Sequence, residues 1–166
     1  MNILLYINTL ELFLEWWPFL LEALPLLNRT NVGSEKVSAD RYFSVLTRVA
    51  LGPPSDGVVI VLASKNTKPL GFVVLLNNTA PFSPKTALCY AVYSNNKCAT
   101  AVRQLDRETK GWCTLHGYKK MVAASRMIHG ATVRWFKNRG FERDCLVFRR
   151  TVLMSCLQHA FWKLNE

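Results

Sequence analysis

The stretch from Thr86 to Arg150 decides the fold, and it opens with the apolar run Thr86-Ala-Leu-Cys-Tyr-Ala-Val-Tyr93. A continuous apolar run of this length is typical of a strand, and the polar residues from Ser94 to Lys97 predict a turn after it. From Cys98 onward the apolar residues follow a helical spacing. The stretch therefore begins with a predicted strand that passes into a helix through a turn large enough to hold a phosphate.

The same stretch continues with a second alternation of strand and helix. A helix is predicted over Cys98–Leu115, with a break or bend at Gly111, and Lys119–Ser125 predicts a short strand. Ala131–Phe141 predicts a short helix ended by a glycine, and Asp144–Arg149 predicts another strand. A C-terminal helix is expected after it, because five apolar residues recur at helical spacing: Leu153, Leu157, Ala160, Phe161 and Leu164.

The N-terminal part of the chain predicts a strand and then a helix rich in aromatic residues. Asn2–Ile7 is short and apolar, which favours a strand, and either Asn8 or Thr9 can cap the helix that follows. Pro18 cannot donate a hydrogen bond to the residue four positions before it. The helix is therefore expected to kink or restart there and to end at Pro25.

A loop, a second helix and a hairpin follow. Asn28–Val37 predicts a loop, and Ser38 starts a helix that runs to about Ala50. Val58–Ala63 and Leu70–Leu76 are continuous apolar runs separated by a polar turn, which predicts a hairpin covered on both faces. The whole order of elements predicts an α/β fold with one mixed sheet of six to seven strands, helices on both faces and an extra C-terminal helix.

The length and composition fit one globular domain. With 166 residues, 50% of them apolar, the chain can bury one core but is too short for two ordinary domains, and it differs from disordered and fibrous proteins. We therefore expect a single domain over 1–166. It comprises an N-terminal strand with two helices (1–52), antiparallel strands (53–95), the half with the phosphate-sized turn (96–151) and a C-terminal helix (152–166).

The very apolar N-terminus, Met1–Leu27, predicts a core helix. It lacks the basic region and the small-residue cleavage site of a signal peptide. Glu11, Glu15 and Glu22 interrupt it, and each acid would cost about 2.5–3.5 kcal/mol near the centre of a bilayer. Membrane association is therefore not expected.

The positive charge is concentrated in one half of the chain. Against 11 Asp and Glu stand 21 Lys and Arg, and residues 97–150 hold 13 basic and 4 acidic side chains. Such a field favours an anionic partner, namely a nucleotide-like cofactor, nucleic acid, an acidic protein or a membrane surface, while a basic surface kept for solubility explains it equally well. The candidates for a phosphate-facing patch are Arg134, Lys137, Arg139 and Arg143.

The cysteines and histidines indicate reduced thiols and no metal site. The 5 cysteines are odd in number and include no C-x-x-C pair, which favours a reducing compartment such as the cytoplasm. The 3 histidines, His116, His129 and His159, are scattered along the chain. No zinc site is predicted.

The order of elements resembles that of the GNAT acyltransferases. In this family a strand, two helices and three antiparallel strands precede the cofactor loop, its helix, a parallel strand, and a short helix before the last strand. The fourth and fifth strands splay apart, and acyl-CoA lies in the gap with its pyrophosphate on backbone amides at the start of the helix. The resemblance implies that the strands at 86–93 and 119–125 separate in this way.

The cofactor loop can be compared with the family's pattern in detail. That pattern is R/Q-x-x-G-x-G/A, and this chain has Lys97-Cys-Ala-Thr100-Ala-Val102 at the matching place. A basic residue is kept, while Thr100 and Val102 fill the positions where glycine lets the backbone approach a phosphate. The resemblance implies a cofactor-binding set made of Val92, Tyr93, Lys97, Cys98, Ala99, Thr100, Ala101, Val102 and Phe136.

A second signature covers the predicted short helix. The family pattern Asn-x-x-Ala-x-x-hydrophobic-Tyr-x-x-x-Gly-Phe resembles His129-Gly-Ala-Thr-Val-Arg-Trp-Phe136-Lys-Asn-Arg-Gly-Phe141. The Gly-Phe ending agrees, but the tyrosine that often protonates the departing thiolate is Phe136, which has no proton to give. A glycine-capped amphipathic helix explains the same residues without any activity.

The resemblance also implies a base that deprotonates an amine, and the three predicted central strands contain no carboxylate. The catalytic candidates are Tyr93, His129 and Tyr118, with His116 as a further titratable neighbour, although each is more often a packing residue. Cys89 is a candidate covalent acyl acceptor, but no histidine is paired with it in the sequence.

Three hypotheses for function follow. The first is an acyl-CoA-dependent N-acyltransferase that uses acetyl-CoA or another acyl-CoA and an amine acceptor. The second is a non-catalytic protein of the same fold that serves in assembly and resembles internal virion components of short-tailed phages; its partners would be virion or host proteins, in the host cytoplasm or the virion. The third is nucleic-acid binding through the basic half.

Overall fold

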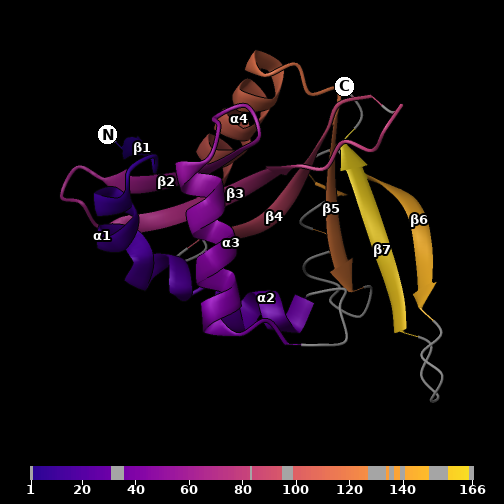
Figure 1. The fold of residues 1–166 in the computed structure, drawn as a ribbon, viewed down its shortest axis with the longest axis horizontal. Coiled ribbons are helices and arrows are strands. Elements are labelled where there is room, and N and C mark those ends of the chain that lie inside the picture. Colours follow the sequence, from indigo (N-terminus) through magenta and orange to yellow (C-terminus); the bar gives the residue numbers. More distant parts are fainter. Residues whose placement is uncertain are drawn as a thin grey trace.

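The computed structural model describes residues 2–30, 36–82, 84–94, 99–126, 134, 137–138, 141–149 and 157–164. Its strands are β1 (Asn2–Tyr6), β2 (Gly57–Ser64), β3 (Pro69–Asn77), β4 (Thr86–Ser94), β5 (Lys120–Arg126), β6 (Phe141–Arg149) and β7 (Leu157–Leu164). Its helices are α1 (Leu10–Leu21), α2 (Leu24–Thr30), α3 (Ala39–Leu51) and α4 (Ala99–Leu115). Within the described residues, the strands form one seven-stranded sheet in the order β1-β2-β3-β4-β5-β7-β6 (Figure 1). The predicted α/β fold with a mixed sheet is confirmed.

The first two helices use their prolines differently from the prediction. Thr9 is the N-cap of α1, and its hydroxyl accepts a hydrogen bond from the Leu12 backbone N–H at 3.3 Å. The helix continues past Pro18. Pro25 lies in the first turn of α2, where no N–H donor is needed, so the prediction that it ends a helix was wrong. Because α2 runs to Thr30, residues 28–30 are helical, although they were predicted as the start of a loop. No helix of the described residues is long and apolar enough to cross a membrane.

The hairpin and α3 follow the prediction. Ser38 is the N-cap of α3, and its hydroxyl accepts from the Arg41 backbone N–H at 3.2 Å. In β2, 7 of the 8 residues are buried, because helices cover both faces of the strand. The antiparallel pairing of β2 with β3 confirms the hairpin.

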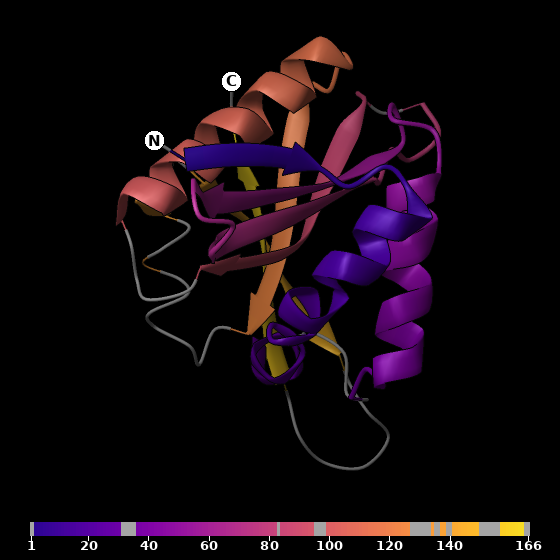
Figure 2. The same ribbon diagram turned by 90° about the vertical axis from the view of Figure 1, so that its left-hand side faces the viewer.

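Two hydrophobic clusters lie on opposite faces of the sheet, and Figure 2 shows α4 on one side of the sheet and α1 and α3 on the other. One contains Leu105 and Trp112 of α4, and the other contains Phe13 of α1 and Tyr42 of α3. The structure shows α4 as one helix through Gly111, so the predicted break is absent. The strands between these layers are therefore fixed from both sides.

The C-terminal elements differ most from the prediction. β6 begins at Phe141, before the predicted start at Asp144. Residues 157–164, predicted as a helix, form β7, which is antiparallel to β5 on one side and to β6 on the other. The helix prediction was wrong because hydrogen bonds along both edges of a central strand outweigh a helical spacing of apolar residues. The short helix predicted around Trp135 falls largely outside the described residues.

Candidate functional site

β4 and β5 lie side by side over only part of their length. They are parallel partners from the pair Thr86 and Lys120 to the pair Cys89 and Ala123. Beyond that last pair both strands continue, and β5 retains only β7 as its partner. The predicted separation of these two strands is confirmed, and it opens at the end of β4 that leads into α4.

A β-bulge lies where the strands separate. Val74 is opposite Ala91 and Leu75 is opposite Cys89, so Tyr90 is an extra residue of β4 without a counterpart in β3. Tyr90 also lies beyond the last pair with β5. The regular ladder of β4 is therefore interrupted at the point where the gap begins.

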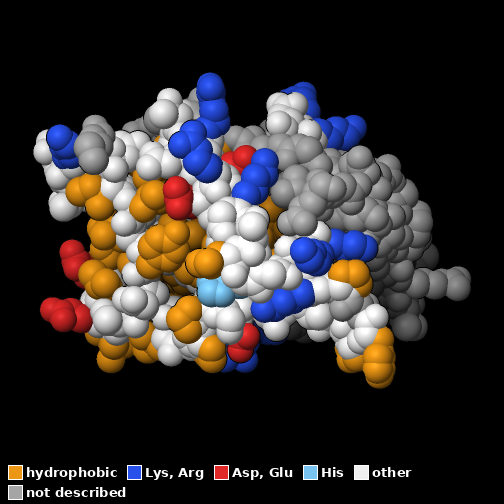
Figure 3. All heavy atoms as spheres, turned by 90° about the horizontal axis from the view of Figure 1, so that it is seen from above, with side chains coloured by type: hydrophobic (Ala, Val, Ile, Leu, Met, Phe, Trp, Pro, Cys, Tyr) orange, Lys and Arg blue, Asp and Glu red, His pale blue; other side chains and the backbone are white. Residues whose placement is uncertain are grey.

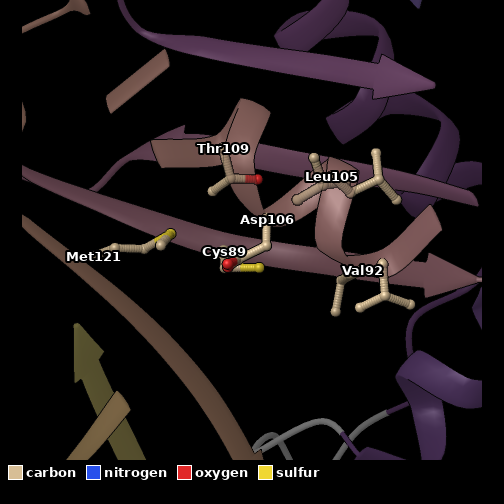
Figure 4. Close-up of a pocket in the computed structure, with 8 residues that line it drawn as sticks. Cys89, Val92, Leu105, Asp106, Thr109 and Met121 are labelled. Atoms are coloured by element: carbon tan, nitrogen blue, oxygen red, sulfur yellow. The ribbon is translucent and has the colours of Figure 1, made fainter. Parts of the chain in front are cut away.

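On the side of α4, the separation contains a small cavity (Figure 4). Its volume is about 20 Å³, which is room for about one water molecule. Figure 4 shows Asp106 reaching from α4 toward Cys89 on β4, with Thr109 farther along the helix. The remaining lining is apolar: Val73, Val92, Val102, Leu105 and Met121.

The cavity keeps the Cys89 thiol protonated. Burial raises the pKa of Cys89 to about 12, and the nearby Cys113 and Asp106 act in the same direction. A thiol with this pKa is a poor nucleophile at neutral pH. The environment of Cys89 is therefore unfavourable for covalent acylation of this residue.

The other two polar groups of the cavity differ in their partners. Asp106 forms an ion pair with Lys110 at 3.3 Å. Thr109 is 5% exposed, and its hydroxyl has no hydrogen-bond partner among the described residues. A buried hydroxyl in that state costs about 1–3 kcal/mol, so water is expected beside it. Within the described part of the chain, no three His, Cys, Asp or Glu side chains come together as a metal ion would require.

On the face of β4 opposite α4, the structure brings a carboxylate to Tyr93. The Tyr93 hydroxyl donates to Oε2 of Glu22 at 3.2 Å, and Glu22 is the C-cap residue of α1. The Tyr93 ring centroid lies 5.7 Å from those of Phe19 and Phe72. Burial and then Glu22 raise the pKa of Tyr93, so the phenol keeps its proton at neutral pH. Sequence reasoning missed Glu22 because it searched the central strands for a carboxylate, and Glu22 lies 71 positions before Tyr93.

Tyr90, the bulged residue, lies on the same face as Tyr93. Its ring stacks on Tyr42 with 6.4 Å between centroids. Burial raises the pKa of Tyr90, and the positive charge of Arg41 opposes that shift. This face of β4 therefore carries an anion hydrogen-bonded near the end of the strand, at Tyr93.

Solved acetyltransferases share the fold of this chain. A GCN5-related N-acetyltransferase from Kribbella flavida matches the chain with a TM-score of 0.71 at 14% identity, over 98% of both chains. The protein yncA from Salmonella typhimurium, solved with its cofactor acetyl-CoA, matches with a TM-score of 0.68 at 16% identity, over 99% of this chain and 93% of that one. This chain has the GNAT fold.

The structure of this chain matches solved GNAT proteins, whereas its sequence has little similarity to theirs. A spermidine N-acetyltransferase from Vibrio cholerae, solved with CoA and spermine, has a TM-score of 0.68 and 10% identity, over 98% of this chain and 94% of that one. No protein-family model matches the sequence, and no curated protein matches it either. The likeness is therefore one of fold.

The residues predicted to bind the cofactor of a GNAT protein are distributed around the gap. Val92 and Val102 line the cavity, and Ala101 of α4 is fully buried. Thr100 is exposed on the first turn of α4. Several predicted groups lie outside the described residues: Lys97, Cys98, the side chain of Ala99, His129 and Phe136.

Tyr118, one of the predicted catalytic residues, lies at the closed end of the β4–β5 pair. Its hydroxyl donates to the Ser55 carbonyl at 2.6 Å, and its ring stacks on Trp112 at 4.9 Å between centroids. Lys85 Nζ lies 4.4 Å from the centre of the same ring. Burial raises the pKa of Tyr118 to about 12. His116 packs against Trp112 at this end, so neither residue is brought to the gap.

A basic surface follows the outer side of α4. Arg103, Arg107 and Lys110 are exposed and recur at spacings that place them on one side of the helix. Figure 3 shows Lys and Arg side chains spread over this side of the molecule, with Asp and Glu among them. Arg134 and Lys137 are also exposed, whereas the side chains of Arg139 and Arg143 lie outside the described part. Binding of nucleic acid here stays a prediction, which a steep loss of DNA binding with rising salt would support.

Proposed function

We propose that the protein is an acyl-CoA-dependent N-acyltransferase with an amine as acceptor. The observation that carries the proposal is the bulge at Tyr90, located where β4 and β5 separate. A bulge can turn a backbone N–H of the strand toward such a gap, where it is suited to bind a carbonyl oxygen on which negative charge develops. The solved structures of the same fold that contain CoA or acetyl-CoA support this choice of donor.

The residues around the gap suit an acyl-CoA. Val92 and Val102 are half-buried and apolar, as the wall for a pantetheine arm should be. The first four amides of a helix have no acceptor within the helix, so the start of α4 is the expected place for the phosphates. Arg103, exposed on the next turn, adds a positive charge on the same element.

When bound, acyl-CoA would supply an acyl group as a thioester. Transfer of this group to the amine forms a C–N bond and breaks the C–S bond. The amine nitrogen loses one proton, and CoA leaves as the thiol. The Tyr90 N–H would hold the carbonyl oxygen. The Tyr93 hydroxyl is hydrogen-bonded to Glu22, and its raised pKa keeps the proton on the phenol. We therefore assign Tyr93 to binding, and His129 remains the candidate for proton transfer.

Calorimetric titration with acetyl-CoA, together with thermal melting, tests donor binding. We expect saturable heat and a melting temperature that rises with ligand concentration. The absence of both at millimolar acetyl-CoA would contradict the proposal and favour a non-catalytic assembly role for this fold.

The role of the bulge is tested with two substitutions at one position. Tyr90→Pro removes the backbone N–H, while Tyr90→Ala removes the side chain and keeps the N–H; proline is tolerated at bulges. We expect acyl transfer from acetyl-CoA to be about 10²–10³-fold slower in the proline variant than in the alanine variant. Equal rates in two variants with the same circular dichroism would assign the carbonyl to another donor.

A further inference from the structure

Three large apolar side chains are exposed near the closed end of the β4–β5 pair. Phe82, in the loop between β3 and β4, is fully exposed. Leu115, the last residue of α4, is 79% exposed, and Leu51, the last residue of α3, is 43% exposed. Each of them follows or precedes a strand of the central sheet, so three separate connections of the fold present apolar groups to solvent.

Hydrogen bonds hold these three connections together. The Trp112 Nε1–H of α4 donates to the Pro54 carbonyl, three residues after Leu51, at 3.2 Å. Lys85 Nζ donates at 2.8 Å to the carbonyl of His116, the residue after Leu115. The loop before β4 also lies beside the start of β5 (Figure 1), where the Lys119 backbone N–H donates to the Lys85 carbonyl at 2.8 Å. The three apolar side chains therefore lie at the same end of the molecule.

The loop that carries Phe82 is anchored at its base. The Thr86 backbone N–H donates to Thr79 Oγ1 at 2.9 Å, and the Asn78 backbone N–H donates to the Thr86 carbonyl at 2.8 Å. Phe82 has a φ of 62°, a left-handed conformation that is uncommon for a bulky residue. Pro81, directly before it, restricts the backbone further. Phe82 is therefore held in solvent in a defined position, which reduces the entropy lost when it binds a partner.

The same end carries a positive charge. Lys119 and Lys120 are exposed and adjacent at the start of β5. Lys85 is half-buried and already donates to a carbonyl, whereas Asp56 is the one acid among the described residues of 51–56, 78–85 and 115–120. We call the following residues the closed-end surface: Leu51, Asp56, Phe82, Lys85, Leu115, Lys119 and Lys120.

We propose that the closed-end surface binds an anionic phospholipid bilayer, with Phe82 at the boundary of headgroups and acyl chains and with Lys119 and Lys120 beside the lipid phosphates. Apolar side chains inserted at this depth and lysines near an anionic leaflet both favour binding of a peripheral protein. The gap between β4 and β5 opens at the other end of their pair, so this surface is separate from it. It also lies outside the N-terminal segment, for which membrane association was not expected.

The shape and chemistry of the surface favour a bilayer over two other anionic partners. A fully exposed side chain on a loop meets a protein well where that protein has a matching pocket, whereas a fluid bilayer admits it without one. Single-stranded nucleic acid would use aromatic rings for stacking on its bases. Two of the three exposed apolar residues, Leu51 and Leu115, are aliphatic and offer no such ring.

The test is cosedimentation of the full chain with vesicles of phosphatidylcholine alone and of phosphatidylcholine mixed with phosphatidylserine. We expect binding to the mixed vesicles that weakens as salt is added, because salt screens the attraction between lysines and the anionic surface. Vesicles of phosphatidylcholine alone should bind at least about tenfold more weakly. Absence of binding to the mixed vesicles at low salt overturns the proposal.

Substitutions at Phe82 test the apolar part. Phe82→Ser should weaken binding to the mixed vesicles by about tenfold or more, because a polar side chain gains nothing from burial among lipids. Phe82→Leu keeps an apolar side chain and should restore most of the affinity. Since Phe82 is fully exposed, both variants should melt at the temperature of the unchanged chain.

A pair of double substitutions tests the charged part. Lys119→Gln with Lys120→Gln should weaken binding by about 25-fold, or about fivefold per lysine. The control is Lys65→Gln with Lys68→Gln, at exposed positions in the turn between β2 and β3, at the opposite end of those strands. It removes the same charge from a chain whose formal net charge is +10, and it should change binding much less.

The remaining outcomes contradict the proposal. Equal losses in the two lysine variants, or full binding by Phe82→Ser, would show that the vesicles attract a basic protein through its overall charge. Binding of a single-stranded oligonucleotide in place of the vesicles, with loss of that binding in Phe82→Ser, would assign the surface to nucleic acid.

Discussion

The two ends of the β4–β5 pair are held by different kinds of contact. At the closed end, Tyr118 combines a hydrogen bond to Ser55, stacking on Trp112 and a contact with the Lys85 cation. At the open end, Tyr90 is bulged out of the ladder and Thr109 borders a small cavity. The comparison indicates how two neighbouring strands can separate at one end of their pair. Side-chain contacts at the other end hold the pair together.

The largest effect is expected when the closed end is dismantled. Tyr118→Ala removes a buried ring with all three of its contacts and should lower the free energy of unfolding by about 3–5 kcal/mol. Tyr118→Phe removes only the hydrogen bond and should cost about 1 kcal/mol. Urea denaturation measures both. A stable Tyr118→Phe variant that binds acetyl-CoA but transfers no acyl group would instead make Tyr118 catalytic.

A smaller loss is expected where β3 approaches β4 near the open end. A Cβ atom at Gly71 would lie 2.7 Å from the Tyr93 carbonyl oxygen and 3.0 Å from Leu105 Cδ1. Gly71→Ala should therefore destabilise the protein by about 1–3 kcal/mol in a thermal melt.

The control is Gly111→Ala, because nothing lies within 4 Å of its added Cβ. Alanine in the helix should stabilise the protein by up to about 1 kcal/mol. Similar losses from both alanines would show that the close approach at Gly71 is not the cause.

Changing the first turn of α4 should affect ligand binding more than stability. Val102→Gly restores a small residue at a glycine position of the family's loop, and we expect tighter binding of acetyl-CoA by calorimetry. The cost is about 1–2 kcal/mol in stability, from the helix propensity of glycine and lost apolar burial. The control is Val102→Ala, which removes the same side-chain packing but does not give the backbone the conformational freedom of glycine. If it tightens binding equally, side-chain bulk is the obstacle and backbone approach is not.

The smallest effect is expected inside the cavity. Thr109→Val replaces a buried hydroxyl without a described partner by a methyl group, which should be neutral or stabilising by up to about 1 kcal/mol. Thr114→Val, at an exposed position of the same helix, corrects for the change in helix propensity. A clear loss of stability at Thr109 alone would reveal an ordered water bound by the hydroxyl.

Local signals predicted the first three-quarters of the chain well. Ser38 caps α3 as expected, and the apolar runs of β2 and β3 pair as a hairpin. The prediction failed where a short segment has two possible partners: residues 157–164 have helical spacing but are inserted between β5 and β6. Strand insertion depends on edges that are far away in the sequence, so no local pattern can reveal it.

The site was predictable only in part. The position of the gap followed from the order of elements, and Val92, Val102 and Tyr93 lie around it. Tyr118 was a candidate because it is titratable, but the structure places it at the closed end. Glu22 was not a candidate, because nothing in α1 indicates which strand its C-terminal residue will contact.

The sequence by itself determined the alternation of helices and strands, since capping groups, prolines and apolar periods act within a few residues. Only the tertiary structure decided which strands separate, where the bulge lies and which carboxylate meets Tyr93. These features depend on hydrogen bonds and packing between segments up to 71 positions apart. Such contacts form only when folding brings the distant segments together.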